Sequence, residues 1–104
     1  MPVKNVTTAG TRVQLTTTRS LCARLTLQWK PANTSTTSIY VGFPGGQGVG
    51  NLVSSTVYDL VLNSGNTSVT IGMGQTYGNS IDPTGIWLDS SASGEGVTWF
   101  AEFI

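Results

Sequence analysis

The stretch Arg24-Leu25-Thr26-Leu27-Gln28-Trp29 decides the fold class of this chain. Apolar and polar residues alternate along it with a period of two. Because successive side chains of a β-strand point to opposite faces, Leu25, Leu27 and Trp29 share one face and the polar residues share the other. The stretch therefore predicts a half-buried strand over residues 24–29.

Other segments carry the same signs of short strands. They are rich in β-branched and aromatic residues and are separated by Gly, Pro, Asn and Asp. The segment 56–62 also suits a short helix, because its apolar spacing fits both periods, and we favour a strand there. The further expected strands cover residues 3–8, 11–17, 38–43, 56–62, 68–72, 85–89 and 96–103.

This pattern predicts an all-β protein. Seven or eight short strands without a convincing helix are typical of an antiparallel β-sandwich or jelly roll, with a small barrel as the remaining option. A length of 104 residues is that of one ordinary domain, so we expect a single β-sandwich domain over residues 1–104. Residues 42–51 include five glycines and predict a mobile loop.

Charge is sparse and divided by segment. The net charge is zero, yet every basic residue precedes every acidic one along the chain. Two arrangements are open: the charges neutralise each other within one folded molecule, or they lie on opposite edges and bring copies together head to tail. The basic residues are Lys4, Arg12, Arg19, Arg24 and Lys30, and the acidic residues are Asp59, Asp82, Asp89, Glu95 and Glu102.

The side chains needed for catalysis are scarce. Without histidine, Ser-His-Asp and Cys-His centres and His-ligated zinc sites are excluded, and the lone Cys22 is expected to be a small buried hydrophobe. Convergence of Asp82, Asp89 and Glu95 would permit glycoside hydrolysis or cation binding, but turns and loops explain these acids more simply. We expect no enzyme activity and no metal or other cofactor.

Membrane and nucleic-acid partners are also not expected. No stretch approaches the roughly 20 apolar residues of a membrane-spanning helix, and no charged and then apolar leader opens the chain. A nucleic-acid-binding domain usually carries a marked basic excess, which this neutral chain lacks.

The three tryptophans divide into two groups. Trp29 and Trp99 lie within alternating strands, so core or interface packing is expected for both. Trp87 lies beside Asp89 and the turn at residues 82–85, where an exposed ring would stack on a sugar.

Several segments together resemble a recurrent type of small virion protein of tailed bacteriophages. They are Ala9-Gly10-Thr11-Arg12-Val13-Gln14-Leu15, Cys22 ahead of Leu25-Thr26-Leu27-Gln28, Ile39-Tyr40-Val41-Gly42, Ile86-Trp87-Leu88-Asp89 and Gly94-Glu95-Gly96-Val97-Thr98-Trp99. The resemblance spans most of the chain but provides no catalytic residues. It implies a β-sandwich or jelly roll found on capsids as a decoration or cement subunit, or in tails and fibres as an adaptor or attachment module.

The expected function is therefore that of a phage structural protein located in the virion. The favoured role is a capsid decoration or cement subunit that binds the major capsid protein, or another virion protein, and its own copies as a homo-oligomer. The alternative role is a tail or fibre module that binds a host receptor or glycan. The candidate interaction residues are Arg12, Arg19, Arg24, Trp87, Asp89 and Glu95.

Overall fold

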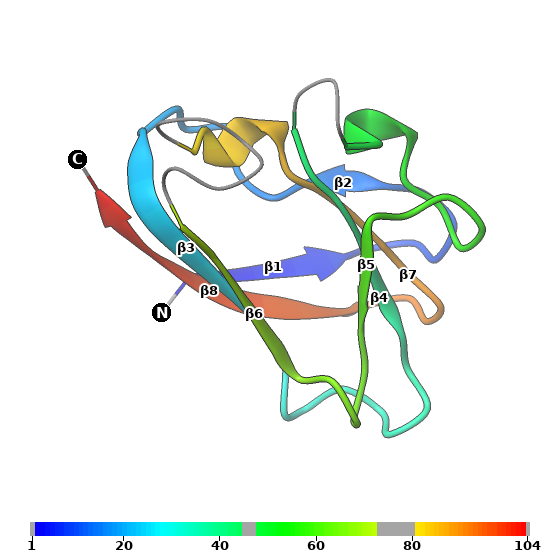
Figure 1. Ribbon diagram of the computed structural model, residues 1–104. Helices are drawn as coiled ribbons and strands as arrows, with labels where there is room; N and C mark the ends of the chain where they lie inside the picture. The colour runs from blue at the N-terminus through cyan, green and yellow to red at the C-terminus, as the bar shows by residue number, and fades with distance from the viewer. Residues whose placement is uncertain (1, 45–47, 73–80, 104) are drawn as a thin grey trace.

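The computed structural model describes residues 2–44, 48–72 and 81–103 and contains two four-stranded antiparallel sheets packed as a β-sandwich (Figure 1). The all-β prediction is confirmed: the helical segments of the described residues are two 3-10 turns, η1 (Gly50–Leu52) and η2 (Pro83–Gly85). The strands are β1 (Val3–Val6), β2 (Val13–Gln14), β3 (Cys22–Trp29), β4 (Ile39–Gly42), β5 (Leu60–Leu62), β6 (Ser68–Gly72), β7 (Trp87–Ser90) and β8 (Glu95–Phe103).

The strand order is that of a jelly roll. One sheet runs β1-β8-β3-β6 and the other runs β2-β7-β4-β5. Strand β1 pairs with β8, β2 with β7, β3 with β6 and β4 with β5, so the chain folds back on itself between β4 and β5. Additional pairing of β3 with β8 and of β4 with β7 rolls this long double strand into two sheets.

Strand β3 lies in the middle of its sheet and supplies much of the core. It pairs with β6 on one side and with β8 on the other. Leu25 and Leu27 are fully buried, whereas Arg24 is exposed and Thr26 is half-buried, as the alternation predicts. Leu25 and Leu27 belong to one continuous core with residues of the opposite sheet, such as Ile39 and Leu88.

The expected strands are mostly present, but several are shorter than predicted. The segment 56–62 contains a strand only at its end, in β5, and the segment 11–17 contains only the two residues of β2. The described part of the glycine-rich segment is also more regular than expected. Gly42 ends β4 and Gly50 begins η1, while residues 45–47 lie outside the described part.

A substitution at Gly96 tests the pairing of β1 with β8. An added Cβ at Gly96 would lie 2.0 Å from the backbone oxygen of Lys4 and 2.7 Å from Cα of Asn5. We expect G96A to lower the free energy of unfolding by about 1 to 3 kcal/mol, because β1 must move away. Urea unfolding measures this loss.

The matched control is G65A in the turn between β5 and β6. The nearest atom to an added Cβ there is Oδ1 of Asn63, at 3.5 Å, so the variant should be as stable as the parent. Equal stability of G96A and G65A would contradict the close approach of β1 to β8.

Candidate functional site

The carboxylates of this chain are engaged within the molecule. Each of the five acidic side chains accepts a hydrogen bond from a backbone N–H or side-chain donor or forms an ion pair. Asp59 shows the pattern: it accepts from the backbone N–H groups of Phe43 and Val49, both at 2.8 Å, and so holds the segment after β4. Four of the five carboxylates bind loop or turn groups, whereas that of Glu102 pairs with Arg24 across two strands.

Glu95 fixes the connection between β3 and β4. It accepts from the hydroxyl of Thr34 at 2.6 Å, from the backbone N–H of Thr34 at 2.9 Å and from the hydroxyl of Thr37. These donors stabilise the ionised form, so the hydroxyls of Thr34 and Thr37 lower the pKa of Glu95. Glu95 was a candidate interaction residue, and its carboxylate already has three donors.

Asp82 plays the same part beside η2. Its carboxylate accepts from the hydroxyl of Thr84 at 2.6 Å and from the backbone N–H of Thr84 at 3.0 Å, and it pairs with Arg19 at 2.9 Å. The hydrogen bond from the Thr84 hydroxyl is the main cause that lowers the pKa of Asp82, and Arg19 adds to it. The first turn of η2 is thereby capped.

Asp89 lies beneath the loop that joins β1 to β2. It is 2% exposed and accepts from the backbone N–H of Gly10 at 3.0 Å and of Ser90 at 2.8 Å. The Gly10 segment covers this part of β7. Asp89, a candidate interaction residue, is therefore buried and does not reach the surface.

The opposite charges of the two segments meet within one molecule. Arg19 pairs with Asp82, and Arg24 pairs with Glu102 at 3.1 Å across β3 and β8. Both pairs are largely exposed and contribute little to stability, but within each pair the two charges cancel. Two of the five basic residues are thus paired with acids inside one molecule, as in the first of the two arrangements that the sequence leaves open.

Cys22 and the acidic residues form no cluster of metal ligands among the described residues. Cys22 is buried and its Sγ donates to the backbone oxygen of Ser20, and burial raises the pKa of the thiol. No group of three or more Cys, Asp or Glu side chains able to hold a metal ion occurs in the part of the chain that the structure describes.

The outward surface of the sheet β1-β8-β3-β6, here called the outer face, is nearly uncharged. Registered neighbours Thr70, Thr26 and Phe100 form one row across it, and Ser68, Gln28, Thr98 and Val3 form the next. Phe100 and Val3 are 43% and 52% exposed. Thr26 and Thr70 join their hydroxyls at 3.0 Å. Among the described residues, the charges on this face are those of the Arg24–Glu102 pair and the ammonium of Lys30, which donates to Oδ1 of Asn5 on β1 at 2.8 Å.

A second surface lies beside the other sheet. A hollow of about 450 Å³, here called the Arg12–Trp87 hollow, is lined by Gly10, Thr11, Arg12, Asn51 and Trp87. Two of the candidate interaction residues, Arg12 and Trp87, thus come together although 75 positions separate them, and Asp89 anchors the Gly10 wall from below. Asn51 was not predicted, because its segment carries no motif.

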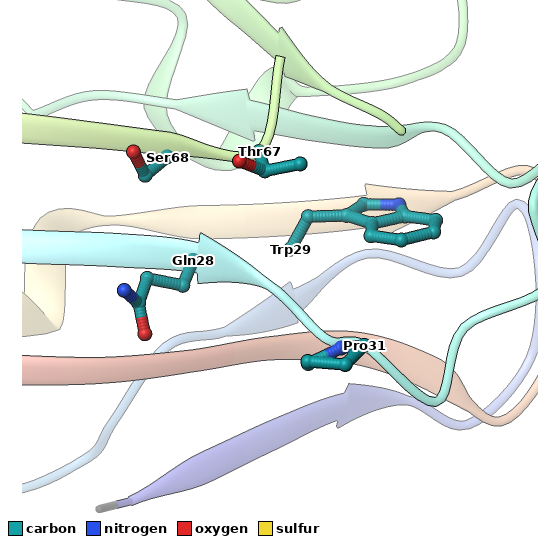
Figure 2. Close-up of a pocket in the computed structure, with 5 residues that line it drawn as sticks. All are labelled: Gln28, Trp29, Pro31, Thr67 and Ser68. Atoms are coloured by element: carbon teal, nitrogen blue, oxygen red, sulfur yellow. The ribbon is translucent and has the colours of Figure 1, made fainter. Parts of the chain in front are cut away.

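A third surface is a groove of about 350 Å³ at the end of β3, lined by Gln28, Trp29, Pro31, Thr67 and Ser68. Figure 2 shows the indole of Trp29 between Thr67 and Pro31, with Gln28 directed away from it. The indole N–H donates to the backbone oxygen of Thr37 at 3.1 Å, and the side chain packs against the core. Core packing of Trp29 and Trp99 is confirmed, so this groove is built around a structural residue.

Comparisons with known proteins give no relative. No protein-family model, curated protein or solved structure matches the chain. In the described ranges, no helix has the length and apolarity needed to cross a membrane.

The lowered pKa values of Asp82 and Glu95 predict a pH dependence of stability. As the pH falls through the range where carboxyls titrate, the unfolded chain binds protons more readily than the folded one at these two sites. The free energy of unfolding should therefore be fully supported near neutral pH and decrease between about pH 5 and pH 2. Urea unfolding across this range should show a weaker decrease in D82N/E95Q. An unchanged pH dependence in that variant would contradict the assigned roles.

Proposed function

We propose that this chain is a structural protein of a tailed-phage virion, a decoration or cement subunit that binds the major capsid protein and its own copies. The outer face is the observation that carries the proposal. This surface is formed mainly by hydroxyl and amide groups and two exposed apolar side chains, Phe100 and Val3. Among the described residues it carries only the Arg24–Glu102 pair and the ammonium of Lys30, so a neighbour that covers it desolvates few charges.

Binding on the outer face would combine two effects. Covering the phenyl ring of Phe100 and the methyl groups of the surrounding threonines contributes about 25 cal/mol of binding free energy for each Å² of apolar surface removed from water. The hydroxyl and amide groups of Thr26, Thr98 and Gln28 provide hydrogen bonds that fix the register of the partner. Such a surface suits a permanent contact in a shell.

The fold agrees with this role by analogy. Eight-stranded jelly rolls occur in viral capsid domains and also in lectins and cupins, so the strand order is compatible with a virion protein without requiring one. The resemblance of sequence pattern to small phage virion proteins points the same way.

The proposal includes the absence of catalysis. An acid or base catalyst needs a carboxyl that is free to exchange a proton with substrate. The carboxylates of Asp59, Asp82 and Glu95 instead hold the backbone or hydroxyl groups of loops. We propose that the chain acts by binding alone.

A second candidate function is that of a tail or fibre module that binds a host receptor or glycan. The Arg12–Trp87 hollow favours it, because an arginine, an amide and a half-buried indole face one space. This candidate does not need the outer face.

Capsid binding tests the first candidate. Expanded capsids of the phage that encodes this chain, prepared without it, should bind the purified protein at a stoichiometry set by lattice sites, and their melting temperature should rise. Calorimetry of decorated and undecorated capsids measures the shift. Binding without any thermal shift would contradict a cement function.

A pair of variants locates the contact. F100S removes the exposed ring from the outer face and should weaken capsid binding about tenfold or more, as loss of an aromatic anchor does. L52S removes an even more exposed side chain, 64% accessible, from η1 beside the other sheet and serves as the control. Equal weakening by both variants would contradict binding through the outer face.

A further inference from the structure

Arg12 differs from the other two arginines. Arg19 and Arg24 each pair with an acid, whereas Arg12 forms no ion pair among the described residues. Each acidic side chain is bound to other groups. Asp89, which lies beneath the Gly10 segment, accepts hydrogen bonds from backbone N–H groups and forms no ion pair with Arg12. The guanidinium of Arg12 is therefore exposed at the Arg12–Trp87 hollow with its charge available to a ligand.

The walls of the hollow are held in place before any ligand binds. The Gly10 wall is fixed by its hydrogen bond to Asp89 and by the bond from the backbone N–H of Ala9 to Oγ of Ser93 at 2.9 Å. Gly10 has a φ of 86°, a conformation that favours glycine. Trp87 is set by its pairing with Gln14 and Gly42 in the sheet.

The Asn51 wall is held from the other side. The backbone N–H of Val49 donates to Asp59 at 2.8 Å, and the backbone N–H of Gly50 donates to the oxygen of Phe43 at 3.0 Å. These two bonds fix the start of η1, which carries Asn51. A preorganised site binds more tightly because less conformational freedom is lost.

We propose that the Arg12–Trp87 hollow binds a carboxylate-bearing saccharide. The guanidinium of Arg12 matches a carboxylate through two parallel hydrogen bonds. The indole of Trp87 offers an apolar surface to the C–H groups of one face of a sugar ring. The amide of Asn51 and the hydroxyl of Thr11 exchange hydrogen bonds with ring hydroxyls.

The dimensions and lining agree with this ligand class. A volume of about 450 Å³ lies within the usual range for small-molecule sites, and the lining combines one aromatic residue with a few polar groups. An acidic peptide would use the arginine but has no flat polyhydroxylated face for the indole and the amide together. The site extends the second candidate function and does not depend on capsid binding.

The test begins with an array of oligosaccharides that end in hexuronate or sialic acid, with neutral sugars of the same size beside them. The expected result is binding of carboxylated members only. Calorimetric titration with trigalacturonate and its methyl ester then isolates the charge, and the ester should bind at least about tenfold more weakly. Failure of every carboxylated member to bind would overturn the proposal, as would equal binding of trigalacturonate and its ester.

Variants assign the binding to this hollow. R12Q should lose the preference for the carboxylate, and R12K should regain only part of it, since lysine lacks the planar fork. K4Q removes one positive charge from β1, outside the hollow lining, and should bind as the parent does. W87F tests the indole and should weaken the binding of every carboxylated saccharide that the parent protein binds. Equal loss in K4Q and R12Q would overturn the assignment.

Two further measurements distinguish a saccharide site from a site for acidic proteins and from the capsid contact. Polyglutamate should bind far more weakly than trigalacturonate, and equal binding would overturn the proposal in favour of an acidic protein partner. R12Q should retain capsid binding. The two proposals can therefore fail separately: failure of saccharide binding would leave the proposed capsid function intact, and failure of capsid binding would leave the proposed saccharide site intact.

Discussion

The structure depends on carboxylates that hold loops in place. A sandwich of short strands needs many connections, and the backbone N–H groups of those connections need hydrogen-bond acceptors. Asp59, Asp89 and Glu95 supply acceptors to segments that follow β4, β1 and β3 respectively. The two proposed surfaces are formed mainly by hydroxyl, amide and aromatic groups, with the exposed guanidinium of Arg12 at the Arg12–Trp87 hollow.

This constraint links the fold to both proposed surfaces. The hydrogen bond from Gly10 to Asp89 buries an acid and at the same time builds one wall of the Arg12–Trp87 hollow. The ion pair between Arg24 and Glu102 cancels two of the charges on the outer face, where the ammonium of Lys30 remains. The two proposed surfaces belong to different sheets of the jelly roll.

Local patterns predicted the fold because the information lies within a few residues. The alternation in 24–29 determined which side chains of β3 enter the core, and the residues 68–72 were predicted with the bounds that β6 has. The length of β2 was overestimated, because the segment before it turns back over β7. The contact that holds this turn joins Gly10 to Asp89, which are 79 positions apart in the sequence. No local pattern reports such a contact. For the same reason the burial of Asp89 and the role of Asn51 were missed, while Arg12 and Trp87 were identified singly without their proximity.

The dependence of association on salt tests the central claim most directly. If the outer face binds neighbours through apolar contacts and hydrogen bonds, self-association and capsid binding should be nearly the same at roughly 0.05 M and 1 M NaCl, because screening weakens interactions between charges. Sedimentation velocity of the protein alone and with capsids measures both. Dissociation on raising the salt concentration would contradict the account, since it would show that the opposite charges of the two segments hold separate molecules together.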